Sequence, residues 1–121
     1  MYPEIADSWI RSKNYGVDPH QRKLGKNLTP RELKALYRDK QELINAVYEF
    51  MNMNLDLLTA SNYTMSLTDE NGILILSAGE KRKIETLEAI NAVPGAIWTE
   101  EEIGTNCHSL CINLKKPVQL I

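Results

Sequence analysis

The chain has 121 residues, enough for one small domain, and its 43% hydrophobic and 25% charged residues are ordinary for a soluble globular protein. Its formal net charge of −2 is close to neutral, and two cysteines are too few for a disulfide framework. No apolar run approaches the roughly 20 residues that span a membrane, and the first residues lack the basic and then apolar order of a signal peptide. We therefore expect a cytoplasmic protein without a membrane contact.

The first third of the chain carries most of its positive charge. These basic residues form no helix-turn-helix, zinc finger or basic motif interleaved with aromatic residues, so we expect a solvated surface without direct DNA contact. Within residues 10–28, the turn-forming residues Asn14, Gly16 and Asp18 occur without hydrophobic periodicity, which is typical of a connecting segment. Residues 1–28 are accordingly predicted to form an N-terminal arm.

A helix is predicted to begin directly after this arm. Thr29 and Glu32 have the spacing of a capping box, and Pro30 suits the first helical position. No glycine or proline follows before Thr59, so the pattern predicts a single helix over residues 30–58. Its apolar residues form two columns that repeat every seven positions, namely Leu36, Leu43, Phe50 and Leu57, and Tyr37, Ile44, Met51 and Leu58.

The length of this predicted helix indicates a contact with another chain. At about 1.5 Å per residue it would be on the order of 40 Å long, more than one small sheet can cover. We therefore expect a homodimer formed through the 30–58 helix. Two intramolecular alternatives remain: one long helix that lies on its own sheet, or two shorter helices that are broken between Asn52 and Asn54.

The second half of the chain is predicted to combine short strands with short helices. Polarity alternates along residues 63–68, as in a half-buried strand, and residues 69–72 have the composition of a turn. The further predicted elements are an apolar strand at 73–76, an amphipathic helix at 81–92, a helix at about 106–114 and a final strand at 117–121. The predicted fold class is α+β, with about three strands in an antiparallel sheet.

The nine residues from Trp98 to Asn106 combine an aromatic ring, three carboxylates and a Gly-Thr-Asn helix start. Gly104 allows a tight turn, and Thr105 and Asn106 are suited to cap the helix that follows. The amides exposed at such a helix start attract carboxylates and phosphates. This segment is therefore predicted to be a recognition loop.

Three segments of the chain, in order, resemble one known family. They are Ile5–Ser12 with Gly16–Pro19, the hairpin sequence Leu67–Leu74, and Gly95–Glu100 with Ile103–Asn106. These segments are similar to the N-terminal sensor domain of bacterial sigma-54-dependent transcriptional activators of the acetoin-catabolism regulator type. That sensor domain is a GAF domain, and the three matches cover most of the chain.

The resemblance implies an antiparallel sheet of five or six strands, with helices behind it and a ligand pocket on the other face. With about three strands, residues 29–121 would supply the long helix and only the N-terminal part of a GAF-like domain, which would be incomplete. The family acts on transcription through ATPase and DNA-binding modules, but the chain has neither a Walker A pattern nor a terminal helix-turn-helix. The implied function is signal sensing, in which a small metabolite modulates attached modules outside this chain. Neither the effector nor a cofactor is identified.

The family motif also implies five ligand-binding residues. Trp98 would form an aromatic wall of the pocket, and Glu100 would be a polar anchor. Gly104, Thr105 and Asn106 would supply the loop and the helix cap.

Cys107, His108 and Cys111 are added as ligand-binding candidates because the family has an alanine- and glycine-rich stretch at these positions. Two thiolates and one imidazole on a helix begin a metal or cluster site, with a further ligand needed from residues 100–102 or from another chain. Alternatively, the cysteines are small core residues and His108 is their polar neighbour. We favour this second interpretation, and we predict no metal site and no catalytic residue.

An enzyme is the alternative function. Some proteins with a GAF-like fold reduce methionine sulfoxide through cysteines, and this reaction needs an accessible thiolate of low pKa with a resolving partner. Here His108 is the one evident base beside Cys107 and Cys111, and the helix resembles core packing. The sequence therefore favours a sensor over a thiol-dependent enzyme.

Overall fold

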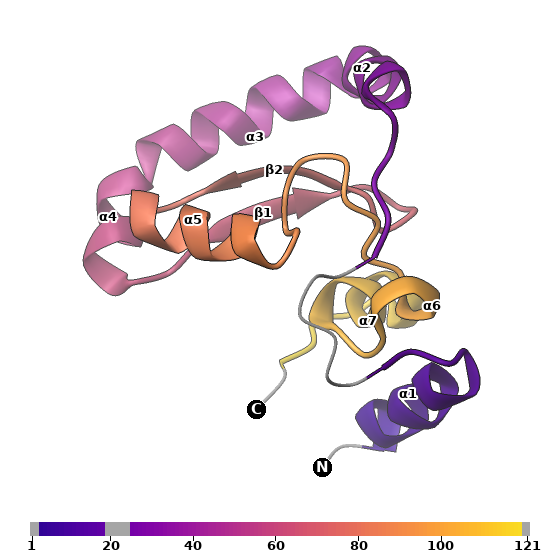
Figure 1. Ribbon diagram of the computed structural model, residues 1–121. Coiled ribbons are helices and arrows are strands. Elements are labelled where there is room, and N and C mark those ends of the chain that lie inside the picture. The colour runs from indigo at the N-terminus through magenta and orange to yellow at the C-terminus, as the bar shows by residue number, and fades with distance from the viewer. Residues whose placement is uncertain (1–2, 19–24, 120–121) are drawn as a thin grey trace.

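The computed structural model describes residues 3–18 and 25–119 of the chain (Figure 1). Its helices are α1 (Pro3–Asn14), α2 (Pro30–Asp39), α3 (Gln41–Met53), α4 (Leu55–Ser61), α5 (Lys81–Ala89), α6 (Glu100–Ile103) and α7 (Cys107–Leu114), and its strands are β1 (Met65–Thr68) and β2 (Leu74–Ala78). Helices and one antiparallel hairpin make an α+β fold, as predicted. Within the described residues, no helix is long and apolar enough to cross a membrane.

The hairpin of β1 and β2 lies within two residues of its predicted position. The strands are antiparallel, with Leu67 opposite Leu76, and the register shifts after Leu67. The carboxylate of Asp69 is buried at the turn and accepts the backbone N–H groups of Asn71 at 2.9 Å and Ile73 at 2.8 Å. An Asp side chain that bonds the backbone in this way stabilises a tight turn.

The predicted third strand is absent from the described part of its range. Residues 117–119 form no strand, and residues 120–121 lie outside the described residues. The preceding helix ends at Lys115 in the left-handed region, with φ of 54°, and Pro117 has no N–H to donate to a ladder. The described residues therefore contain a sheet of two strands, where about three were expected.

Residues 95–98 instead extend the hairpin by irregular backbone pairing. The N–H of Leu74 donates to the carbonyl of Ala96 at 2.9 Å, and the N–H of Trp98 donates to the carbonyl of Gly72 at 2.9 Å. On the other side, the N–H of Ile97 donates to the carbonyl of Lys26 at 2.9 Å. This pairing fastens the segment before α6 to the hairpin turn.

The prediction of one continuous helix over residues 30–58 is wrong. The capping box of Thr29 and Glu32 is present, but the helix is divided into α2, α3 and α4 by turns at Lys40 and Asn54. The Nζ of Lys40 lies 3.0 Å from the carboxylate of Glu70 in the hairpin turn, and the side-chain amide of Asn54 donates to the carbonyl of Phe50 at 2.8 Å. A side-chain amide that bonds the backbone competes with the regular helical pattern. Figure 1 shows that α2 turns away from the axis of α3.

The two apolar columns of this region have different surroundings. Met51 and Leu58 are buried, and α3 packs on β2, whose Ile75 is completely buried. Leu43 and Phe50, from the other column, are 45% and 54% exposed. The column that contains Met51 and Leu58 therefore faces the core, and the column that contains Leu43 and Phe50 lies on the surface.

Candidate ligand-binding site

The carboxylate of Glu100, at the start of α6, is buried and paired with a cation. Glu100 is only 6% exposed, and it accepts hydrogen bonds from the Nε of Arg11 at 2.6 Å and from its Nη2 at 3.1 Å. The hydroxyl of Ser8 donates to the same carboxylate at 2.7 Å. Arg11 and Ser8 of α1 thus form hydrogen bonds with a carboxylate that is far away in the sequence. These bonds join α1 to α6.

Thr105 extends this contact between α1 and the loop. Its Oγ1 lies 2.8 Å from the hydroxyl of Ser8 and 3.3 Å from that of Ser12. Gly104 has φ of +85°, and a Cβ there would lie 3.3 Å from Val17 and 3.6 Å from Ser12. The positive φ favours glycine at position 104, and a Cβ there would also lie tightly against Val17. We call Ser8, Arg11, Ser12, Glu100 and Thr105 the Glu100 cluster.

The Glu100 cluster keeps its carboxylate ionised. Burial alone raises the pKa of Glu100, but the hydrogen bonds from Arg11 and Ser8, together with the charge of Arg11, lower the pKa by more. The net result is a pKa below the ordinary value of 4.5. The hydrogen bond to Glu100 raises the pKa of Arg11 in turn, so both partners carry their charges at neutral pH.

This pKa shift predicts a pH dependence of stability. Since the pKa of Glu100 is lower in the folded chain than in the unfolded chain, the ion pair stabilises the fold fully above about pH 5, and the benefit is lost as the pH falls through the folded-state pKa. The parent chain should therefore lose more free energy of unfolding on acidification than Glu100→Gln. Urea unfolding of both proteins at a series of pH values measures this difference. Carboxylates present in both proteins cancel in the comparison, and parallel pH profiles would contradict the prediction.

Asn106 is the N-cap of α7, as predicted, whereas Thr105 is not a cap. The Oδ1 of Asn106 accepts the N–H of Ser109 at 3.0 Å. Its Nδ2 donates to the carbonyl of Trp98 at 3.1 Å and to that of Gly104 at 2.9 Å. Asn106 is 7% exposed, and the hydrogen bonds of its side chain stabilise the conformation of residues 98–106.

Trp98 and His108 form a second group at the start of α7. Their rings meet edge to face, with centroids 5.5 Å apart and an interplanar angle of 85°. Burial lowers the pKa of His108, so its imidazole is neutral at pH 7. The indole Nε1 of Trp98 is buried and has no hydrogen-bond partner in the described part of the chain.

Cys107 and Cys111 are half-buried free thiols on α7. Among residues 3–18 and 25–119, no group of three or more His, Cys, Asp or Glu side chains is arranged to hold a metal ion. That the two cysteines are small packing residues next to His108 stays a prediction.

Replacing Cys107 and Cys111 together by alanine should change neither the metal content nor the α-helical circular dichroism. Alanine fills most of the space of a small packing residue and has a higher helix propensity than cysteine. Elemental analysis of the purified parent and double variant measures the metal. Stoichiometric zinc or iron in the parent, lost in the double variant, would contradict the packing interpretation.

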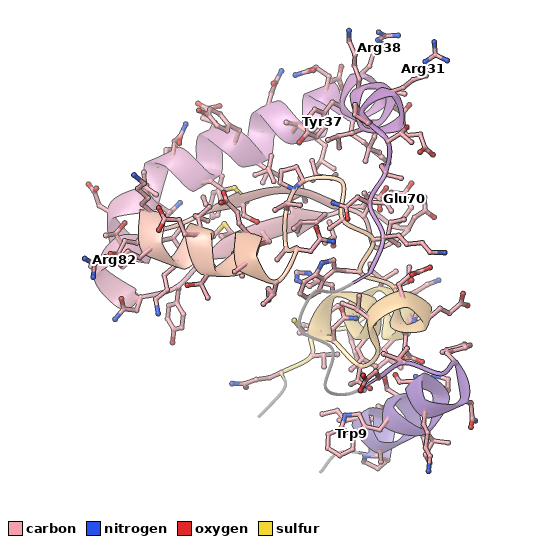
Figure 2. All side chains as sticks on the ribbon, viewed as in Figure 1. Trp9, Arg31, Tyr37, Arg38, Glu70 and Arg82 are labelled. Carbon is pink, nitrogen blue, oxygen red and sulfur yellow. The ribbon has the colours of Figure 1, made fainter. Side chains whose placement is uncertain are left out.

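An open cleft of about 420 Å³ lies next to the Glu100 cluster. Its wall includes Arg11 of α1, Tyr15 of the turn after α1, Asn71 of the hairpin turn and Asn113 of α7. Thr99 and residues 100–101 also line it. Figure 2 shows the labelled Glu70, which also lines the cleft, at the hairpin end that faces α6 and α7.

Among the predicted site residues, Glu100 lines this cleft. Thr105 points to α1, and Trp98, Asn106 and His108 surround the start of α7. Arg11, Tyr15, Asn71 and Asn113 were missed, because they are polar residues from three separate parts of the chain that only the fold brings together.

Comparison with known proteins identifies distant relatives. The chain is 28% identical over 116 residues to the acetoin dehydrogenase operon transcriptional activator AcoR of Bacillus subtilis (strain 168). It is 25% identical over 116 residues to an uncharacterized 47.3 kDa protein in the thcA 5'region of Rhodococcus erythropolis. It is 26% identical over 102 residues to a signal-transduction and transcriptional-control protein of Clostridium beijerinckii.

These alignments cover most of the chain but only a small part of each relative. They include 96%, 96% and 84% of this chain, and 19%, 26% and 16% of the three relatives, respectively. No protein-family model and no solved structure matches the chain. Two of the three relatives carry the names of transcriptional regulators, and the similarity therefore supports a regulatory role.

Proposed function

We propose that this chain is the signal-sensing part of a bacterial transcriptional activator. The observation that carries the proposal is the alignment of 96% of the chain with 19% of a protein named as a transcriptional activator. A segment of that size corresponds to one module of a larger regulator. The α+β fold and the open cleft are compatible with a module that holds a small molecule.

In this proposal the chain acts in the cytoplasm as part of a GAF-type sensor of a sigma-54-dependent activator. A small metabolite binds it and changes how attached ATPase and DNA-binding modules assemble. Residues 1–28 would connect the module and residues 29–121 would form its body. The Glu100 cluster supports a direct route for the signal, because it joins α1 to the segment that carries the recognition loop.

A chimaeric activator tests this function. In AcoR of Bacillus subtilis, the segment that aligns with this chain is replaced by the chain, and transcription from the acetoin dehydrogenase operon is measured in media that differ in carbon source. We expect output that depends on the medium, whereas a deletion of the segment gives output that does not. Equal output in all media, at equal protein level, would contradict a sensing role.

A thiol-dependent enzyme remains the alternative, with Cys107 and Cys111 as its reactive groups. Burial lowers the pKa of the neighbouring His108, so its imidazole adds no positive charge beside the two cysteines at pH 7. An assay of the purified chain with free methionine sulfoxide and a thiol reductant tests this alternative. We expect no turnover, and turnover lost in the double alanine variant would establish the enzyme instead.

We also propose a homodimer in which the exposed apolar column of α3 and α4 meets a second copy. Leu43, Phe50 and Leu57 of this column are 45%, 54% and 64% exposed, and they repeat at the spacing used by paired helices. A second copy presents an identical column, so the two surfaces match in polarity and period.

Phe50→Glu should shift the chain from dimer to monomer, because it introduces a charge into the middle of this column. Tyr48→Glu is the matched control, since Tyr48 has a similar exposure of 59% but does not belong to the column. Light scattering at tens of micromolar measures the mass. A monomeric parent, or a dimer that tolerates Phe50→Glu, would contradict the proposal. Substitutions of Ile44 or Met51 are unsuitable, because Met51 is 2% exposed and Ile44 shares its inward column.

A further inference from the structure

The open cleft is built by four separate parts of the chain. Arg11 and Tyr15 come from α1 and the residues after it, and Asn71 comes from the hairpin turn. Thr99 and Glu101 come from the start of α6, and Asn113 comes from α7. Because these parts are far apart in the sequence, a molecule in the cleft would contact all of them at once and hold them together.

Most of the polar side chains in the cleft have no hydrogen-bond partner among the described residues. In the part of the chain that the structure describes, no hydrogen bond is made by the side chains of Tyr15, Asn71, Thr99, Glu101 or Asn113. Two of these residues are amides, which both donate and accept, and two are hydroxyls. The cleft therefore presents several unoccupied donors and acceptors in a small volume, which is the pattern of a site for a polar ligand.

The charges of the cleft determine which ligands it favours. Arg11 is neutralised by Glu100 through the pair at 2.6 Å, and Glu70 is neutralised by Lys40 at 3.0 Å. Glu101 is exposed and has no counter-ion among the described residues. The cleft thus carries about one net negative charge, which disfavours carboxylates and phosphates.

We propose that this cleft binds a small uncharged or cationic molecule that is rich in hydroxyl or amino groups. The proposal rests on the proposed function and names the chemical class of its effector. Asn71 of the hairpin turn and Asn113 of α7 bind the hydroxyl groups, and Glu101 accepts a hydrogen bond from an amino or hydroxyl group of the ligand. Arg11 and Tyr15 connect the bound molecule to α1, so the ligand fastens α1 to the rest of the module.

Three probes with one carbon skeleton and different charges test the ligand class. Sorbitol is neutral, glucamine is cationic and gluconate is anionic. In two-dimensional amide NMR of the purified chain, we expect sorbitol and glucamine to shift the side-chain amide signals of Asn71 and Asn113, with glucamine binding more tightly. Gluconate should leave these signals in place. Equal shifts by gluconate, or no shift by any probe, would overturn the proposal.

Two variants locate the binding, and a third is their control. Asn113→Leu should weaken sorbitol binding about tenfold through the loss of hydrogen bonds. The control Asn52→Leu, at an exposed asparagine of α3 outside the cleft, should bind sorbitol like the parent. Glu101→Gln should remove the preference for glucamine over sorbitol. Melting temperatures of all three variants establish that they are folded, and unchanged binding by Asn113→Leu would place the probes elsewhere and overturn the site.

A conformational readout tests the link to α1. Hydrogen exchange of the α1 amides should slow when sorbitol or glucamine is bound, because the ligand bridges α1 and α7. An unchanged exchange rate with bound probe would overturn the link.

Native mass spectrometry separates the failure of this site from the failure of the function. A small molecule that stays with the purified parent chain and also with Asn113→Leu would support sensing and overturn the cleft. Medium-independent output of the chimaeric activator would overturn the sensing function itself.

Discussion

Glu100→Ala is expected to lower the free energy of unfolding by about 2 to 3 kcal/mol, the largest effect of any single charge removal that the structure indicates. The substitution removes the acceptor of three hydrogen bonds from Arg11 and Ser8. Ser8 is completely buried and cannot replace that partner with bulk water, whereas Arg11 is 44% exposed and regains part of its hydration. Because Arg11 is partly exposed, we expect a smaller loss in the free energy of unfolding than a fully buried, unpaired charge would cause.

The neighbouring carboxylate supplies the control for this prediction. Glu101 lies in the same helical turn, but it is exposed and has no described partner. Glu101→Ala should therefore change the free energy of unfolding by less than about 0.5 kcal/mol. Urea unfolding followed by circular dichroism measures both variants. Equal losses would mean that the first turn of α6, and not the contact with Arg11, determines the effect.

The destabilisation should also be local to α1. Glu100, Arg11 and Ser8 join α1 to α6, and a further ion pair joins Glu4 to Lys116 at 3.0 Å across an exposed surface. Exposed ion pairs contribute little to the free energy of unfolding, so the Glu100 cluster is the main polar contact that holds α1 in place. Hydrogen exchange in Glu100→Ala should therefore accelerate first in the α1 amides, before the amides of β2.

The sequence predicts those parts of the fold that depend on local signals. The capping box at Thr29, the hairpin turn at Asp69 and the N-cap at Asn106 each rest on residues within four positions of one another, and each is present. Local hydrogen bonds of this kind are determined by residue type and spacing.

The helix break at Lys40 shows where local signals are insufficient, whereas the break at Asn54 agrees with one of the alternatives that the sequence left open. The seven-residue repeat continues through both positions, so periodicity alone favours one helix. At Lys40, the side chain pairs with Glu70, which is thirty positions away in the sequence. A break that is accompanied by such a distant contact is not visible in a local pattern.

The candidate site was predictable only in part for the same reason. Among three adjacent carboxylates, the resemblance to the family motif singles out Glu100, but the sequence does not indicate that Glu100 is buried or paired with Arg11. Burial and the approach of Arg11 give Glu100 its role, and both depend on how α1 packs. The cleft residues on α1, the hairpin turn and α7 have no shared motif, and their proximity follows from tertiary structure alone.

Asn106→Ala should lower the free energy of unfolding by about 2 to 3 kcal/mol, more than the roughly 1 kcal/mol of an ordinary helix cap. The side chain accepts the N–H of Ser109 and also donates to the carbonyls of Trp98 and Gly104. The bonds to Ser109 and Gly104 are buried, and the bond to Trp98 is partly buried. Asn106→Asp separates the two roles, because aspartate caps a helix as well as asparagine does but cannot donate. It should remain less stable than the parent, since its carboxylate would face two carbonyl oxygens.

Thermal and urea unfolding measure both variants, and near-ultraviolet circular dichroism should report a changed environment of Trp98. A loss of only about 1 kcal/mol in Asn106→Ala, with Asn106→Asp as stable as the parent, would mean that the bonds to Trp98 and Gly104 do not stabilise the loop.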